Sequence, residues 1–134
     1  MKKGCHHGPN DWVGTQRTFL LAWGVPVLML VGAIGVEPSL RALVWFLSLA
    51  WMGVACVANA VRCGRTHCYF TGPFFFVVAC LTLLDGLDLG PEGWIWLGLG
   101  LVMGTLGLWW LSEALWGPYR KHGLTRRKFT GGQL

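Results

Sequence analysis

Charged residues are scarce in this chain, since Asp, Glu, Lys and Arg make up 13% of its 134 residues. That share is about half of what a soluble globular domain carries. Hydrophobic residues make up 54%, and the mean hydropathy is +0.51. The chain has no phosphate-binding glycine loop, no Gly-x-Ser-x-Gly elbow and no metalloprotease signature, so no familiar enzyme class is indicated. We therefore expect a membrane protein rather than an enzyme.

Other motif classes are missing as well. No histidine lies within the apolar runs described below, which excludes a haem held by two transmembrane histidines, and we expect no haem. The basic residues behind the net charge of +5 stand in short segments beside apolar runs. Because this pattern is typical of membrane orientation, we expect no nucleic-acid partner. The cysteines form neither a Cys-Cys pair nor the Cys-x-x-Cys spacing of zinc ribbons and thioredoxin-like proteins.

Four apolar segments approach the roughly 20 residues that cross a hydrocarbon core. We expect Pro26 to kink the first segment and Ser39 to cap the helix of the second. Pro73 is expected in the first helical turn of the third segment, directly after a loop turn. Asp85 and Asp88 interrupt the third segment, so a re-entrant segment is the alternative there. We predict spans at 19–36, 40–61, 74–89 and 94–115 within a transmembrane domain at 18–116, flanked by tails at 1–17 and 117–134.

Lys and Arg predict the orientation of these spans. Ten of the eleven precede the first span, separate the second from the third or follow the fourth, and only Arg41 lies on the opposite side. Short loops rich in Lys and Arg remain in the cytoplasm. This division predicts an all-α, four-helix transmembrane bundle that is integral to the cell membrane, with both termini cytoplasmic.

Thiol and imidazole side chains are concentrated between the second and third spans. Cys63, His67 and Cys68 fall within six residues, a density that packing alone does not explain. Cys56 shares a helical stripe with Met52, and Cys80 enters the third span to a similar depth, so that Cys56 and Cys80 could face each other. Such side chains bind soft transition-metal ions of the Cu, Zn or Hg class. The predicted metal ligands are Cys63, His67, Cys68, Cys56 and Cys80, with Cys5, His6 and His7 as further soft ligands on the tail.

These residues also have an ordinary structural interpretation. A single Cys or Met in a membrane helix is most often a packing residue, which applies to Cys56, Cys80 and Met52. Asn59 is expected to hydrogen-bond the loop backbone, with orientation of a bound ligand as the alternative. Glu113, near the end of the fourth span, is expected to pair with an arginine of the loop or to reach water. A stable disulfide is not expected on the cytoplasmic side.

The segment from Asn59 to Pro73, Asn-Ala-Val-Arg-Cys-Gly-Arg-Thr-His-Cys-Tyr-Phe-Thr-Gly-Pro, resembles a motif of small uncharacterised prokaryotic membrane proteins. The resemblance implies a prokaryotic inner-membrane location and no established activity. In size, thiol content and charge the chain is also similar to small mercuric-ion transport proteins. It lacks the vicinal cysteine pair that those proteins typically carry, and this departure leaves only the broader class of thiophilic-metal handling.

Three functions remain open. The first is a membrane protein that binds or transports a thiophilic ion through the cysteine and histidine side chains. The second is a membrane thiol–disulfide redox protein in which Cys63 and Cys68 cycle. The third is an accessory subunit of a larger membrane complex. Gly100 and Gly104 form a small-xxx-small pair, so besides the lipid bilayer we expect a second copy or a larger membrane protein as partner.

Overall fold

The computed structural model describes residues 15–89 and 93–117. Cys5, His6 and His7 lie outside these ranges, as do most of the two predicted tails. The described residues form helices and no strand, which confirms the all-α class. Four helical stretches are long and apolar enough to cross a membrane: Gln16–Gly35, Pro38–Cys63, Thr66–Gly86 and Trp94–Trp116.

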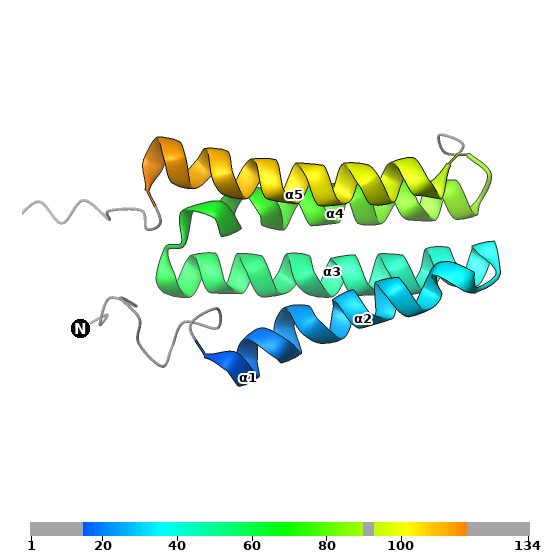
Figure 1. Ribbon diagram of the computed structural model, residues 1–134, viewed down its shortest axis with the longest axis horizontal. Helices are drawn as coiled ribbons and strands as arrows, with labels where there is room; N and C mark the ends of the chain where they lie inside the picture. Colours follow the sequence, from blue (N-terminus) through cyan, green and yellow to red (C-terminus); the bar gives the residue numbers. More distant parts are fainter. Residues whose placement is uncertain (1–14, 90–92, 118–134) are drawn as a thin grey trace, which may run out of the picture.

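The first stretch consists of four short elements: α1 (Gln16–Phe19), a π-helical turn (Leu20–Gly24), α2 (Val25–Gly32) and a 3-10 turn (Ala33–Gly35). Pro26 has no N–H to donate to the carbonyl four residues earlier, and the helix accommodates this by widening. The N–H of Val25 instead bonds the carbonyl of Leu20, five residues earlier. The stretch is inclined to α3 (Figure 1), close to it at the 3-10 turn and apart from it at α1.

Helix α3 (Pro38–Cys63) begins directly after Glu37, which caps it. The Glu37 carboxylate accepts hydrogen bonds from the N–H groups of Ser39 at 3.2 Å and Leu40 at 3.1 Å. These two bonds hold the pKa of Glu37 below its usual value of 4.5. The prediction that Ser39 caps the helix was therefore wrong, because Pro38 takes the first helical position and Ser39 donates its backbone N–H instead.

Helix α4 (Thr66–Gly86) differs most from the prediction. It begins at Thr66 rather than at residue 74, and only Gly64 and Arg65 connect it to α3, so His67 and Cys68 belong to its first turn. Pro73 is consequently inside the helix, where it has no N–H to donate to the preceding turn. The helix ends at Gly86, before the predicted end at 89.

Helices α3 and α4 are antiparallel (Figure 1) and pack closely because small residues separate them. A Cβ added to Gly53 would lie 3.1 Å from the Phe76 ring, and one added to Gly86 would meet Ala42. Helix α5 (Trp94–Trp116) packs on α4, with Gly104 beside the Phe74 ring. The indole N–H of Trp45 donates to the Leu30 carbonyl at 3.1 Å and ties α2 to α3.

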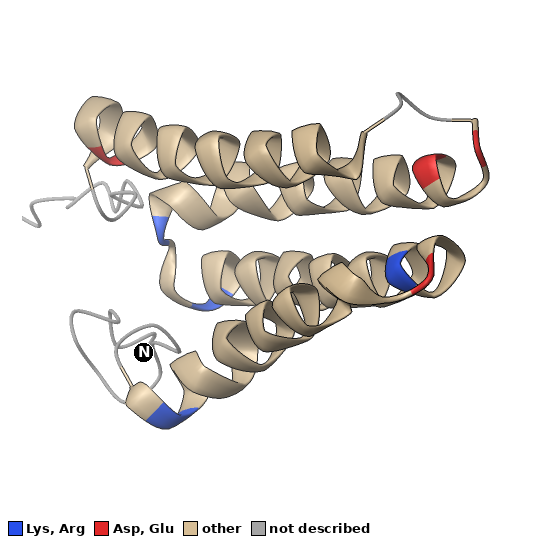
Figure 2. Ribbon diagram, turned by 45° about the vertical axis from the view of Figure 1, so that its right-hand side comes forward, with Lys and Arg blue, Asp and Glu red and all other residues tan. Residues whose placement is uncertain are grey.

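The charged side chains divide between the two ends of the bundle (Figure 2). Arg17, Arg62 and Arg65 lie at one end, while Glu37, Asp85 and Asp88 lie at the other. The exceptions among the described residues are Arg41 and Glu113. Both ends of the described chain lie at the arginine-rich end (Figure 1). This arrangement is the one that the orientation prediction requires, and the cytoplasmic placement of that end remains a prediction.

Candidate functional site

Two of the predicted ligands, Cys56 of α3 and Cys68 of α4, meet inside the bundle. Their side chains are 2% and 0% exposed and within hydrogen-bonding contact of each other. Gly72 makes the contact possible, because a Cβ at this position would lie 2.8 Å from Cγ2 of Val57 and 3.6 Å from Cβ of Cys56. We call Cys56 and Cys68 the thiol pair.

Hydrogen-bond donors from three membrane-length helices surround the thiol pair. The Thr71 hydroxyl lies 3.7 Å from Sγ of Cys56, and Nδ2 of Asn59 lies 3.9 Å from Sγ of Cys68. The Thr71 hydroxyl also lies 2.9 Å from the His67 carbonyl, so its hydrogen is shared. The indole of Trp23, from the first membrane-length stretch, hydrogen-bonds Cys56 as well. Donors aimed at sulfur stabilise negative charge on it, and this effect acts against the burial of the two side chains, which opposes that charge.

The amide of Asn59, expected to bond the loop backbone, contacts the Cys68 thiol. Thr71 and Trp23 are site residues that the sequence analysis did not identify. The signal for Thr71 was available, because it stands three residues after Cys68 and so on the same helical face. Nothing in the sequence indicated Trp23, because the rotation of the first stretch about its axis depends on its packing against α3.

His67 points away from the thiol pair toward α5. Its Nδ1 lies 3.0 Å from Oε1 of Glu113, and the two side chains are 14% and 29% exposed. The imidazole also makes an edge contact with Trp109, with ring centroids 6.5 Å apart. The partner of Glu113 is thus a histidine, whereas an arginine or water was expected.

The other two predicted ligands are not brought to the pair. Cys63 is disulfide-bonded, contrary to expectation. Cys80 is exposed and lies twelve residues beyond Cys68 on α4, or about 18 Å along the helix axis. Cys56 and Cys80 do not face each other. Within residues 15–89 and 93–117 no three His, Cys, Asp or Glu side chains gather where they could hold a metal ion.

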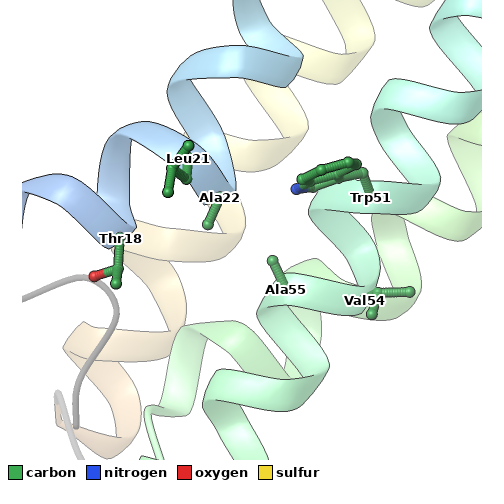
Figure 3. A pocket seen from close by; sticks show the side chains of 6 residues that line it. All are labelled: Thr18, Leu21, Ala22, Trp51, Val54 and Ala55. Carbon is green, nitrogen blue, oxygen red and sulfur yellow. The ribbon is translucent and has the colours of Figure 1, made fainter.

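A pocket of about 570 Å³ lies between the first membrane-length stretch and α3 (Figure 3). Ala22 and Ala55, neighbours in sequence of Trp23 and Cys56, contribute to its wall. The only hydroxyl in the wall, that of Thr18, donates to the Thr15 carbonyl at 3.0 Å. The pocket therefore offers no ligand for a metal ion. Its lining residues are Thr18, Leu21, Ala22, Trp51, Val54 and Ala55.

Comparison with known proteins adds no assignment to this geometry. The chain matches no protein-family model, no curated protein and no solved structure.

Proposed function

We propose that the chain is an integral membrane protein that binds a thiophilic metal ion through Cys56 and Cys68. The observation that carries the proposal is the contact between these two thiols, which come from different helices and are both buried. Of the predicted ligands in the described residues, these are the two whose side chains are in contact. The proposed site does not include the other three predicted ligands, Cys63, His67 and Cys80.

The chemistry of two thiolates limits the kind of ion. Soft thiolate ligands select Cu(I) and similar ions over Mg or Ca. Cu(I), Ag(I) and Hg(II) form stable complexes with two sulfur ligands, whereas structural Zn(II) takes four ligands. Asn59 and Thr71 donate toward the sulfur atoms, and Arg65 is close enough to Cys68 to interact with its charge. These groups would offset the excess negative charge of two thiolates around one ion.

The position of the site favours exchange with the cytoplasm. The thiol pair lies near the arginine-rich end of the bundle, because Cys68 is in the first turn of α4, which begins directly after Arg65. The positive-inside rule assigns this end to the cytoplasm. An ion bound there would enter from, or leave to, the cytoplasmic side of the inner membrane.

Thiol–disulfide exchange at the same pair is a second candidate, favoured by the same contact. The earlier hypothesis placed the redox couple at Cys63 and Cys68, but Cys68 meets Cys56 instead. In this reaction the two thiols would reduce the disulfide of a partner. The products would be a Cys56–Cys68 disulfide and two partner thiols, so that atoms and electrons balance.

The metal content of the detergent-purified protein under reducing conditions tests the proposal. We expect the wild type, loaded with Cu(I), Ag(I) or Hg(II), to retain a single ion per chain. The Cys56→Ser/Cys68→Ser variant should lose it, and Cys80→Ser, which alters an exposed thiol, should keep it. Retention by the double variant would place the site elsewhere.

The redox candidate gives a different result in the same preparation. It predicts no retained metal in any variant. It also predicts that oxidised glutathione removes two titratable thiols from the wild type, and that reductant restores them. Absence of both metal and disulfide would reject both functions at this pair.

A further inference from the structure

The face of α3 that carries Cys56 continues inward with residues that the proposed site does not use. Ser48, Met52, Cys56 and Asn59 follow one another at helical spacing, and their exposed fractions are 2%, 7%, 2% and 0%. Met52 belongs to the same core cluster as Cys56 and Cys68. The buried face of α3 therefore carries a second sulfur atom and a hydroxyl, both deeper in the bundle than the thiol pair.

The Ser48 hydroxyl is unusual because it has no hydrogen-bond partner in the described part of the chain. Serine and threonine inside helices commonly donate to a carbonyl of the preceding turn. Thr82 and Ser112 do so, at 2.7 Å to Ala79 and 3.1 Å to Trp109. Thr66 is also unpartnered, but it stands at the first position of α4, where no preceding turn exists. A buried hydroxyl without a partner costs free energy, which a bound ligand would recover.

Met52 is within reach of an ion bound at Cys56. Side chains four residues apart on a helix have Cβ atoms about 5–6 Å from each other. A thiolate and a thioether at this spacing can hold one soft ion between them. Thioethers, like thiolates, bind Cu(I), so Met52 is suited to the same ion as the thiol pair.

We propose that Cys56 and Met52 form a second, deeper position for the ion, and that the protein passes a monovalent soft ion, Cu(I) or Ag(I), from Cys68 to Met52 and on toward Ser48. This inference rests on the proposed function of the thiol pair. Two protons leave the thiols when the ion binds. The bond from the ion to Cys68 then breaks as the bond to Met52 forms, while Cys56 stays bound, and no oxidation state changes. The Cys68 thiolate takes up a proton from the nearby aqueous end. When the ion moves on toward Ser48, its bond to Cys56 breaks and the Cys56 thiolate takes up the second proton.

Charge selects a monovalent ion for the deeper position. None of the buried side chains in residues 15–89 and 93–117 is charged. A monovalent ion between one thiolate and a neutral thioether carries no net charge, whereas a divalent ion there keeps one positive charge. Because an uncompensated charge is costly inside a membrane, Hg(II) is expected to stop at the thiol pair.

The test uses the full chain in liposomes that contain a trapped Ag(I) chelator. Met52→Leu and Ser48→Ala are each compared with a matched control: Met103→Leu, at an exposed methionine of α5, and Ser112→Ala, at a buried serine whose hydroxyl is partnered. We expect the two controls to bind Ag(I) as the wild type does, and Met52→Leu to bind the ion at the thiol pair alone. Uptake should fall about tenfold in Met52→Leu and Ser48→Ala and remain at the wild-type rate in both controls.

The outcomes separate this inference from the proposed function. Absence of uptake by the wild type, or equal uptake by each variant and its control, would overturn the passage from Cys56 to Met52 and leave metal binding intact. Binding of Ag(I) by Cys56→Ser/Cys68→Ser would instead overturn the proposed function. X-ray absorption provides a readout independent of uptake: Ag(I) bound to the wild type should show thioether as well as thiolate neighbours, whereas Ag(I) bound to Met52→Leu should show thiolate neighbours alone.

Discussion

Nδ1 of His67, in the first turn of α4, lies 3.0 Å from Oε1 of Glu113, in the last turns of α5. This contact joins two helices at the end of the bundle that holds the thiol pair. His67 directly precedes Cys68, so the contact also limits how far the first turn of α4 can move. His67, expected to be a metal ligand, thus has a structural partner in α5.

A double-mutant cycle tests the contact between these two side chains. We expect His67→Ala and Glu113→Ala each to lower the free energy of unfolding, and the double variant to lose less than the sum. The expected coupling is about 0.5–1 kcal/mol, in the range of polar contacts between membrane helices. Equilibrium unfolding in mixed micelles, followed by circular dichroism, measures it. Strictly additive losses would show that the two side chains do not interact.

The cap of α3 predicts a dependence of stability on pH. The N–H groups of Ser39 and Leu40 lower the pKa of Glu37 from 4.5, so its charge stabilises the folded state above that value. The contribution is lost as the pH falls through the lower folded pKa. We expect Glu37→Gln to unfold at a lower temperature than the wild type at neutral pH, and this difference to disappear in strong acid. Thermal scans at both pH values measure it, and an unchanged difference would exclude a role for the charge.

Gly72 is predicted to control the distance between α3 and α4 at the thiol pair. In Gly72→Ala the new Cβ would lie 2.8 Å from Cγ2 of Val57, and we expect a loss of about 1–3 kcal/mol of unfolding free energy. Val57→Ala in the same chain should recover part of it. Gly100→Ala is the control, because nothing lies within 4 Å of its added Cβ. Equal stability of Gly72→Ala and Gly100→Ala would contradict the close approach.

Substitutions at Gly100 and at Gly104 are expected to distinguish an effect on partner binding from an effect on folding. A side chain at Gly104 meets the Phe74 ring, whereas one at Gly100 meets nothing in this chain. We expect Gly104→Leu to lower the unfolding temperature and Gly100→Leu to leave it unchanged. If α5 associates with another copy through its glycines, Gly100→Leu should also shift the protein toward monomer in sedimentation experiments in detergent. An unchanged mass would reject an interface at Gly100.

The helical class and the number of long apolar segments followed from local properties. Apolar length determines where a membrane helix is possible, so the fourth predicted span, 94–115, closely matches α5. Pro73 misled the prediction for α4, because proline marks a helix start in water but is tolerated inside membrane helices. Ser39 misled the prediction of the α3 cap, because Glu37, two residues earlier, accepts hydrogen bonds from the first N–H groups of the helix.

By itself the sequence determined which residues are apolar, where the basic residues stand, and that thiols are concentrated near the turn between α3 and α4. Those properties follow from composition and order along the chain. Only the tertiary structure decided that Cys68 meets Cys56 instead of Cys63 or Cys80, that His67 turns to Glu113, and that Trp23 reaches the pair. Such contacts depend on the rotation and register of packed helices, which are set by small residues such as Gly72 on one helix and their neighbours on another.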